Sequence, residues 1–584
     1  MRNKELDVFK GIAIIAVVLY HLGISKYGYL GVDMFLVVAG YLTAKSVNKR
    51  CNRGGYFRFI TDRLFRLWPL LVIACAICLL FGLFMMLPDD YESVAQSVVA
   101  TNLFANNILA AITTKNYWDV VNEYKPLMHT WYVGLLMQYY VFYPLVLFLI
   151  GHFIKSKKIL DVSFLTVTSL LCVASLVLYI VWNSEASKFY YLPFRLYEFC
   201  VGSLVFFILE KERTINIVRG NWKAIALACA YIIVLLMLFA NNIDMPKMFR
   251  LWGVVVLSAF IVAFVAKGEC QQEKLFANRW VACIGAASFS IFIWHQVVFA
   301  LTRYSFTSKL TDAIPFLIVF LLIVFLSTCS YRYVEKLEKT KTAWICTIVL
   351  LILTTGSSLY VYAHAGVVRD IPELDVKKSD IHRGMWAEYC DRGYVYDKDF
   401  SSSTKPHLFV IGNSFGRDFV NIIKESPIAD SVEVSYSDPQ TYKDKKIRFS
   451  KADIVFLSSK GVDKNLIEDI RSKCQQKTKF YIVGEKNFGE SNGQIYRHCF
   501  TNDFHKLTIT MEKGYKEKND SLKSQYSKCF IDMIAMVQQA NGNVRVFTDD
   551  GKFISQDCRH LTKAGAQYYA KLIDWKRFVS DYSK

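Results

Sequence analysis

Residues 343–363 read AWICTIVLLILTTGSSLYVYA, a stretch without charged residues that is long enough to cross a bilayer as a helix. Upstream of it, the sequence alternates apolar runs of similar length with short polar loops. Downstream, from about residue 364, short β-branched and aromatic runs alternate with polar segments of helical pattern. The stretch therefore marks the boundary between a membrane half and a soluble half.

About ten more candidate spans precede this boundary, because a membrane-crossing helix needs roughly 20 mostly apolar residues. They lie near 8–24, 28–44, 67–87, 128–150, 162–182, 193–209, 223–240, 250–266, 284–302 and 314–331. The predicted fold is a polytopic α-helical membrane domain with about 11 transmembrane helices, followed by a soluble α/β domain. We place the membrane domain at 1–340, the last span at 341–365, a linker at 366–405 and the soluble domain at 406–584.

Composition supports a membrane protein and argues against nucleic-acid binding. Apolar residues make up 53% of the 584 residues and charged residues 20%, which is more apolar than a typical soluble chain. The net charge of +19 comes mainly from the segments between spans, with no basic tail or basic low-complexity run. Between the second and third spans alone stand Lys45, Lys49, Arg50, Arg53, Arg58, Arg63 and Arg66.

Such basic loops alternate along the chain, so the positive-inside rule places the N-terminus in the cytoplasm. With about eleven crossings, the soluble domain lies outside, which in a bacterium is the periplasmic or cell-surface side of the inner (cytoplasmic) membrane. An even number of crossings would place it in the cytoplasm instead. An oxidising compartment would permit up to two disulfides among Cys390, Cys474, Cys499, Cys529 and Cys558.

Ionisable residues inside apolar spans are functional candidates, because each costs roughly 2.5–3.5 kcal/mol at the centre of a span. His21 lies in the outer part of the first span and Asp33 opens the second, so the carboxylate could orient the imidazole of a general base. A histidine that only hydrogen-bonds at the membrane interface explains His21 equally well. His129 heads the fourth span, also on the outer side.

Other charged residues in or near the spans have structural explanations that compete with functional ones. Arg195 and Glu198 are three apart on one helical face, as in a structural ion pair, although they could also contact substrate. His295, in the ninth span, is interpreted as structural. Arg63 and Arg66 share a face near the inner side, where they could bind the phosphates of a cytoplasmic donor or only anchor the helix.

The motifs of the membrane half, taken in their order along the chain, resemble those of the acyltransferase-3 family of bacterial membrane O-acyltransferases. The resemblance covers roughly residues 4–340. The resemblance rests on Lys10 with His21, Gly31-Val32-Asp33-Met34-Phe35, Gly40-Tyr41, Arg63 with Arg66, His129-Thr130-Trp131, Gln138-Tyr139-Tyr140, Arg195 with Glu198 and Gly202, Ser288-Phe289-Ser290 with Trp294-His295, and Ser330-Tyr331-Arg332-Tyr333-Val334-Glu335. The chain departs from the family at Lys10, where Arg is usual, and at Leu136, where a Glu is common. The role of that Glu must be absent or supplied elsewhere, for example by Glu198.

The resemblance implies an acyl-CoA donor, acetyl-CoA, on the cytoplasmic side and an acceptor hydroxyl on the outer side. His21 would act as general base or transient acyl carrier, with Asp33 beside it. The residues expected to bind donor or substrate are Lys10, Arg63, Arg66, His129, Trp131, Gln138, Arg195 and Glu198. Neither a metal nor a bound cofactor is expected.

The soluble half carries a candidate catalytic triad. Predicted strands at 407–411, 453–457, 479–483 and 544–547 alternate with helices near 463–476, 520–541 and 563–573, which indicates a parallel sheet covered by helices. Ser414 follows the first strand directly in Gly412-Asn413-Ser414, and Asp557 stands three residues before His560. These three residues could supply nucleophile, orienting carboxylate and base.

The triad motifs resemble the SGNH esterase/acetyltransferase fold, a flavodoxin-like α/β fold, with Asn413 in place of a common Asp. The resemblance implies Ser414, Asp557 and His560 as the catalytic residues. The oxyanion candidates are the Ser414 amide, Gly484 and Asn487, although the spacing of the last two is one residue longer than the family pattern. A degenerate domain that binds glycan without chemistry is the alternative.

The combined prediction is a membrane O-acyltransferase that moves an acyl group from acetyl-CoA to a hydroxyl of a surface polysaccharide, such as lipopolysaccharide O-antigen, or of its lipid-linked precursor. Two other functions stay open at this point. One is a glycan O-acetyl esterase with a membrane anchor, and the other is a polysaccharide transporter.

Overall fold

The computed structural model describes residues 3–50, 55–113, 124–154, 156–211, 221–265, 278–305, 312–380, 384–401, 404–489, 493–496, 503–555 and 557–579. The chain forms two compact units, Met1–Phe81 with Val94–Leu359 and Gly82–Ser93 with Tyr360–Lys584. The boundary near residue 360 agrees with the change of pattern in the sequence. Arg53 and Cys499, named above, lie outside the described residues.

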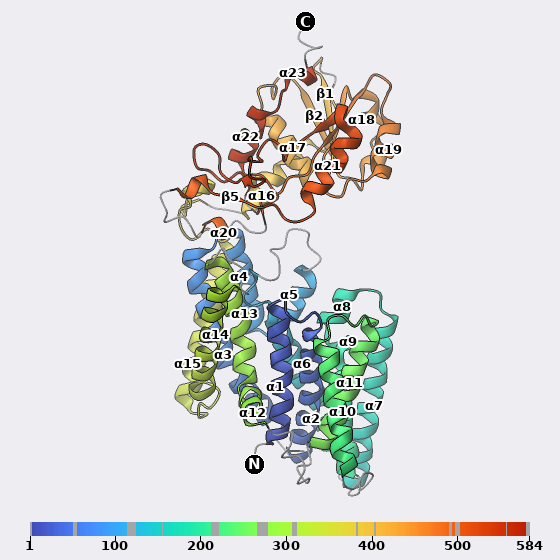
Figure 1. Ribbon diagram of the computed structural model, residues 1–584, viewed down its shortest axis with the longest axis vertical. Helices are drawn as coiled ribbons and strands as arrows, with labels where there is room; N and C mark the ends of the chain where they lie inside the picture. The colour runs from blue at the N-terminus through green and yellow to red at the C-terminus, as the bar shows by residue number, and fades with distance from the viewer. Residues whose placement is uncertain are drawn as a thin grey trace. The chain divides into compact units, whose positions relative to one another are not determined.

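The first unit is helical throughout its described residues (Figure 1). Its helices, of which a few extend past the limits of the unit, are α1 (Lys4–His21), α2 (Gly31–Arg50), α3 (Gly55–Met85), α4 (Pro88–Asn102), α5 (Asn106–Thr113), α6 (Trp131–Phe153), α7 (Lys157–Val181), α8 (Glu185–Tyr190), α9 (Leu192–Lys211), α10 (Asn221–Phe239), α11 (Lys247–Val265), α12 (Arg279–Ala286), α13 (Ser288–Ser305), α14 (Ala313–Tyr333) and α15 (Lys341–Ala363). The short 3₁₀ helices η1 (Gly28–Leu30) and η3 (Met128–Thr130) precede α2 and α6.

Each predicted span overlaps a single α-helix except 284–302, which runs across the break between α12 and α13. Not every one of these helices is a clear span. Eight described helices are long and apolar enough to cross a membrane, or nine if the pair α12 and α13, bent by 71°, counts as one broken span. α1 carries several charged residues in its first turns, and the apolar part of α10, Ile225–Phe239, is short. The total of eleven therefore stays a prediction.

Glycines allow close helix contacts at two places in this unit. A Cβ added at Gly40 of α2 would lie 1.9 Å from the carbonyl oxygen of Phe199 of α9, and one at Gly202 would lie 1.9 Å from the carbonyl oxygen of Val37. A Cβ at Gly285 of α12 would lie 1.7 Å from a backbone oxygen of α1. Such small-residue contacts are typical of helix pairs in membranes, where backbones approach closely.

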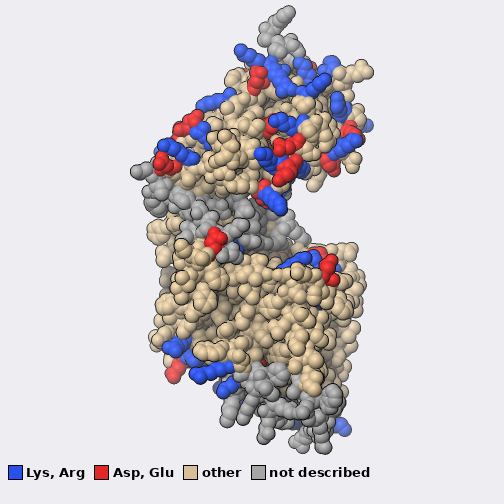
Figure 2. Space-filling view, in the orientation of Figure 1, with Lys and Arg blue, Asp and Glu red and all other residues tan. Residues whose placement is uncertain are grey.

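The surfaces of the two units differ in charge (Figure 2). On the visible face, the helical unit shows a broad area without charged residues, whereas the second unit shows intermixed basic and acidic side chains. Large apolar side chains such as Val173, Phe325 and Ile352 are exposed on the first unit, with exposed fractions of 60%, 64% and 64%. A lipid environment explains this exposure, because a water-facing surface of this kind would aggregate.

The second unit contains a five-stranded parallel sheet in the order β2-β1-β3-β4-β6. Its strands are β1 (His407–Ile411), β2 (Glu433–Ser437), β3 (Ile454–Leu457), β4 (Lys479–Val483) and β6 (Phe530–Ile531). Helices α17 (Ser414–Lys424), α19 (Lys464–Lys473), α21 (Tyr515–Tyr526) and α22 (Lys563–Leu572) belong to the same unit. The parallel α/β architecture predicted for this half is confirmed.

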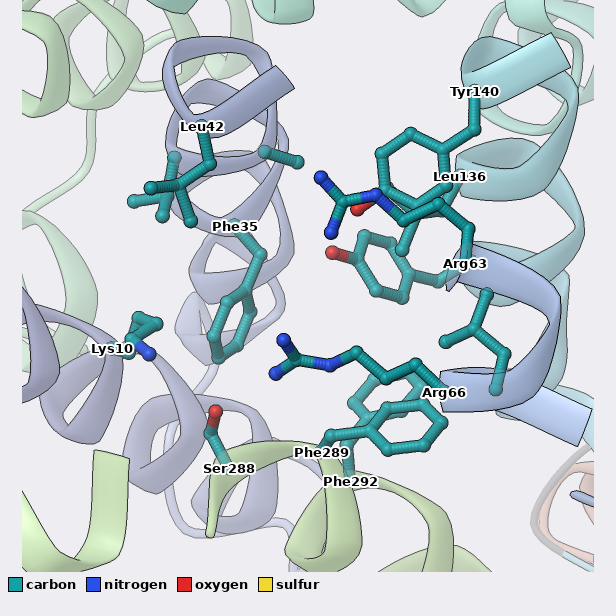
Figure 3. A pocket seen from close by; sticks show the side chains of 14 residues that line it. Lys10, Phe35, Leu42, Arg63, Arg66, Leu136, Tyr140, Ser288, Phe289 and Phe292 are labelled. Carbon is teal, nitrogen blue, oxygen red and sulfur yellow. The ribbon is translucent and has the colours of Figure 1, made fainter. Parts of the chain in front are cut away.

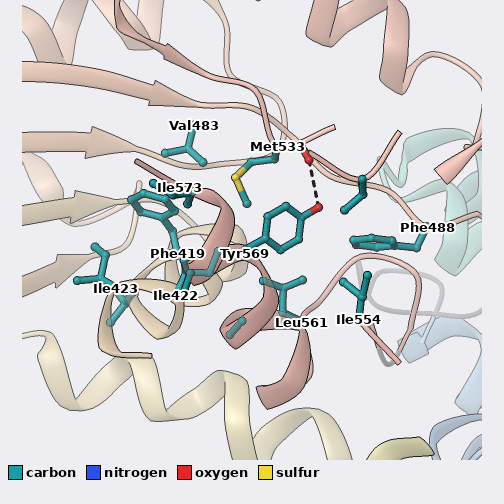
Figure 4. Packing of buried hydrophobic residues seen from close by; sticks show 14 of the residues in the cluster. Phe419, Ile422, Ile423, Val483, Phe488, Met533, Ile554, Leu561, Tyr569 and Ile573 are labelled. Atoms are coloured by element: carbon teal, nitrogen blue, oxygen red, sulfur yellow. Dashed lines mark hydrogen bonds between the residues drawn. The ribbon is translucent and has the colours of Figure 1, made fainter. Parts of the chain in front are cut away.

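Buried apolar residues form separate clusters in this unit, and the larger one is partly shown in Figure 4. Within it, the hydroxyl of Tyr569 on α22 donates to the carbonyl oxygen of Met533 at 3.1 Å, and Phe419 of α17 is among its members. Leu87, from the segment 82–93, belongs to the same cluster, as does Val367. Residues 366–405, expected to be a linker, therefore contribute to the core.

Two predicted elements differ in the structure. The strand expected at 544–547 is β7 (Val544–Arg545), which pairs with β5 (Thr508–Ile509) in a separate antiparallel ribbon. The helix expected at 520–541 ends with α21 at Tyr526, because Phe530–Ile531 enters the main sheet as its edge strand. Pairing with β4 thus overrides the helical pattern of the sequence.

The described cysteines of this unit form no disulfide, which contradicts the two disulfides that the sequence would permit. These cysteines are Cys390, Cys474, Cys529 and Cys558, and Cys499 is outside the described residues. Burial raises the pKa of the Cys390 thiol, so this group stays protonated.

Candidate active site

A cavity of about 120 Å³ in the first unit gathers three of the predicted donor-binding residues (Figure 3). Lys10 reaches it from α1, and Arg63 and Arg66 reach it from α3. Leu136 of α6 and Ser288 of α13 also line it. Residues far apart in the sequence therefore share one cationic pocket.

The pocket is suited to an anion because its described lining includes three cations and no carboxylate. The Arg63 guanidinium lies 4.8 Å from the ring centroids of both Phe59 and Tyr140, which hold it against aromatic faces. Lys10 is ion-paired with Asp7 at 2.6 Å, and Arg66 is exposed. Guanidinium groups bind phosphate through paired hydrogen bonds, so the arrangement could hold a phosphorylated donor.

Glu198, suggested above to replace the Glu that is absent at Leu136, is buried in an ion-pair cluster and is not among the described residues that line the pocket. Arg195 forms ion pairs with Asp33 at 2.8 Å and with Glu198 at 3.1 Å, and all three side chains are at most 5% exposed. The ion pair expected between Arg195 and Glu198 is confirmed. Asp33, expected beside His21, has Arg195 as its partner instead, since a buried carboxylate is best satisfied by a cation.

Three histidines meet at another place in the same helical unit. The ring of His295 lies 5.2 Å from that of His21 and 5.3 Å from that of His129, measured between centroids. His295 and His129 are buried, with exposed fractions of 0% and 2%. His295 is therefore not isolated, as the sequence suggested, and its structural role stays a prediction. In the sequence, the signal for its position near the pocket was that Ser288, Phe292 and His295 share one helical face.

The tautomer of His295 follows from its hydrogen bond. Its Nδ1 lies 3.1 Å from the carbonyl oxygen of Ile291, and a carbonyl only accepts, so Nδ1 carries the proton. Nε2 then keeps a lone pair, and this buried atom has no hydrogen-bond partner among the described residues. An unprotonated imidazole nitrogen beside two further histidines can act as base or nucleophile.

Two other predicted binding residues have structural partners. The Gln138 amide donates to Asn107 Oδ1 at 2.8 Å and accepts from Asn107 Nδ2 at 3.2 Å. Trp131 packs against Phe189 and Tyr190, with ring centroids 4.7 and 5.7 Å apart. These contacts explain both residues without a substrate.

In the second unit, the predicted triad assembles. His560 Nε2 lies 3.2 Å from Ser414 Oγ, and His560 Nδ1 lies 2.5 Å from Asp557 Oδ2. The His560 backbone N–H also donates to Asp557 Oδ1 at 2.7 Å. Burial alone would raise the pKa of the Asp557 carboxyl, but His560 and the backbone N–H groups outweigh it and hold the pKa below its usual value. The carboxylate is thus ionised and orients the imidazole.

A buried ion pair that the sequence interpretation missed supports the triad. Lys486 Nζ lies 2.7 Å from Asp418 Oδ2, and these side chains are 3% and 1% exposed. Asp418 stands one helical turn after Ser414 on α17, and it accepts the Leu561 N–H at 3.3 Å, next to His560. The pair thereby links the helix of the nucleophile to the loop of the base.

Two of the three oxyanion candidates are already engaged. The Gly484 N–H donates to the carbonyl oxygen of Ile531 at 2.8 Å, which continues the pairing of β4 with β6. The Asn487 side-chain amide donates through Nδ2 to the carbonyl oxygen of Gly489 at 3.3 Å and to Glu512 Oε2 at 3.5 Å. Both candidates thus already have acceptors in this structure. The Ser414 amide, in the first turn of α17 after the N-cap Asn413, stays a prediction.

The comparison with known families gives a match over the N-terminal part of the chain. The profile of the acyltransferase domain family (acyltransferase-3) matches residues 3–332, more than half of the chain. The chain therefore belongs to this acyltransferase family.

Curated relatives have related names. A proposed O-acetyltransferase of Staphylococcus aureus (strain COL) is 25% identical over 348 residues, which are 56% of each chain. The peptidoglycan O-acetyltransferase OatA of Listeria monocytogenes is 23% identical over 308 residues, 51% of this chain and 49% of the relative. A proposed membrane-bound transacylase, BcsY of Komagataeibacter xylinus, is 25% identical over 341 residues, 57% of this chain and 82% of the relative.

The chain thus spans about half the length of the first two of these relatives. No solved structure gives a significant match.

Proposed function

We propose that this protein is a membrane O-acyltransferase that moves an acyl group, acetyl, from cytoplasmic acyl-CoA to a hydroxyl of a surface polysaccharide or its lipid-linked precursor. One observation carries the proposal: the same helical unit holds a cationic pocket with Lys10, Arg63 and Arg66 and a cluster of histidines. The names of the relatives support O-acetyl transfer, and that of OatA supports a glycan acceptor. Lipopolysaccharide O-antigen is the acceptor that we propose.

In the proposed reaction, the three cations hold the phosphates of the donor on the cytoplasmic side. The imidazole of His21 attacks the thioester carbonyl carbon, so a C–N bond forms, the C–S bond breaks, and the imidazole proton goes to the leaving thiolate. The acceptor hydroxyl then attacks the same carbon, a C–O bond replaces the C–N bond, and the hydroxyl proton passes to the imidazole. His295 and His129, beside His21, hold these protons in a water-poor site.

The triad of the second unit has two alternative roles in this proposal. As a carrier, Ser414 would accept the acyl group and pass it to the sugar, with His560 moving the proton. As a glycan O-acetyl esterase, the same triad would remove the group with water. The observed hydrogen bonds, in which the Ser414 hydroxyl donates to His560 Nε2 and His560 Nδ1 donates to Asp557, favour chemistry over passive glycan binding.

The test is the ester content of surface glycan, measured by mass spectrometry in a deletion strain that carries the full chain or a variant. His21→Ala should remove the ester, whereas His152→Ala, an exposed histidine at the end of α6, should retain it. Unchanged ester content in the His21 variant at equal protein level would refute the membrane mechanism. Loss of exported glycan with unchanged ester per sugar would favour a transporter.

Ser414→Ala separates the two roles of the triad. A carrier role predicts that ester content falls, whereas an esterase predicts that it rises. An unchanged ester content would refute both roles.

A further inference from the structure

Phe292 of α13 contacts both the cationic pocket and the histidine cluster. Its side chain lines the pocket, as Figure 3 shows. Its ring centroid also lies 5.1 Å from that of His129 and 5.7 Å from that of His295. One side chain thus lies between the proposed donor pocket and the histidine cluster.

The helices explain why these sites are so close. Ser288, Phe289 and Phe292 of α13 line the pocket, and His295 follows three residues later on the same face. At a rise of about 1.5 Å per residue, His295 stands only about 4.5 Å along the axis from Phe292. A similar arrangement recurs at the start of α6, where Tyr132 lines the pocket and His129, in the preceding η3, lies three residues before it.

Aromatic packing closes the space between the two sites. Tyr132 meets Phe292 edge to face with centroids 5.2 Å apart, and Phe35 packs on Tyr132 at 6.3 Å. Phe292 is 4% exposed and Tyr132 is 7% exposed, so the rings lie in a packed interior. An acyl group that moves from pocket to histidines must displace one of these rings.

We propose that Phe292 is the gate between the donor pocket and the histidine cluster, and that its size restricts transfer to short acyl groups. This inference rests on the proposed function. A two-carbon acetyl group requires a small displacement of the ring, whereas each added methylene must share the space that the ring fills. Phe292 is therefore a specificity-determining residue, and His295 takes part in the acyl transfer that the gate controls.

The test uses inverted membrane vesicles that contain the full chain and the endogenous acceptor, supplied with acetyl-CoA or butanoyl-CoA. Release of CoA and formation of the matching ester are both measured. Phe292→Ala should raise the ratio of butanoyl to acetyl transfer at least about tenfold, because pockets discriminate single methylenes by about 10–200-fold. Phe292→Trp should lower transfer from both donors.

Phe299→Leu is the matched control, because Phe299 is also buried on α13 and packs on His295 with centroids 5.8 Å apart, but does not line the pocket. Its butanoyl-to-acetyl ratio should stay that of the parent chain. If Phe292→Ala fails to accumulate, Phe292→Leu gives the same comparison with a smaller loss of volume.

An unchanged ratio in every Phe292 variant that transfers acetyl would overturn the gate, and so would an equal change in Phe299→Leu. A parent chain that releases no CoA from either donor and forms no ester would instead refute the proposed function. The two failures are therefore distinguishable within one experiment.

Discussion

Replacement of Lys486 by Met should destabilise the second unit more than any change at its surface. The Lys486 ammonium lies 2.7 Å from the Asp418 carboxylate, with exposed fractions of 3% and 1%. Without it, the partners that the buried carboxylate keeps among the described residues are neutral donors, the Leu561 N–H at 3.3 Å and the Cys390 thiol at 3.4 Å. Loss of one partner of a buried pair costs about 3–5 kcal/mol, because the other charge remains unpaired in the interior.

For a unit of this size, about 1 kcal/mol corresponds to about 2–4 °C in the unfolding temperature, so the expected shift is about 6–20 °C. The combined variant Asp418→Asn with Lys486→Met removes both charges and should lose less than about 2 kcal/mol. The difference between the single and combined variants measures the unpaired charge itself.

The assay is pulse proteolysis of the full chain in detergent over a temperature series, with a C-terminal tag that reports the second unit. Lys464→Met is the matched control, because its partner Glu468 lies 3.7 Å away and the two side chains are 72% and 63% exposed. Such a surface pair contributes about 0–1 kcal/mol. The reasoning is refuted if Lys486→Met shifts the midpoint no more than Lys464→Met, or if the combined variant is as unstable as the single one.

Three further predictions concern the pocket, the triad and the helix packing. Arg63→Gln would remove one of the three cations that line the pocket, so the KM for acetyl-CoA in vesicles should rise at least about tenfold, whereas Arg63→Lys, which keeps the charge, should have a smaller effect. Because the folded-state pKa of Asp557 is lowered, its ionised form stabilises the second unit above the unfolded-state pKa, and this stabilisation is lost as pH falls through the folded-state pKa. Asp557→Asn should therefore flatten the acid side of the stability curve below about pH 4, and an unchanged curve would contradict the ionised assignment. Gly40→Ala should push α2 away from the backbone of α9 and lower the free energy of unfolding of the helical unit by about 1–3 kcal/mol. Gly356→Ala should be neutral, because a methyl group added there meets nothing within 4 Å.

The sequence predicted the features that depend on local pattern. Long apolar runs predicted the helices of the first unit, and the run at 407–411 predicted the interior strand β1. The triad was also predictable, because Ser414 follows that strand and Asp557 needs only one turn of chain to reach His560. In each case the signal lies within a few neighbouring residues.

Features that depend on distant partners were not predictable. Asp33 and His21 are near in sequence, but the pairing of Asp33 with Arg195 depends on how α2 packs against α9. Gly484 looked like an oxyanion donor until the pairing of β4 with β6 engaged its N–H. His295 looked isolated because its neighbours come from other helices.

The membership of residues 82–93 in the second unit restricts the path of the chain through the membrane. Leu87, in the turn between α3 and α4, is part of the same apolar core as Tyr569, near the C-terminal end of the chain. A single folded body lies on one side of a bilayer, so the chain between these residues must cross an even number of times. The predicted spans from 128–150 to 343–363, about eight by length, satisfy this parity. A topology that omits α10 alone, or counts α12 and α13 as separate crossings, violates it.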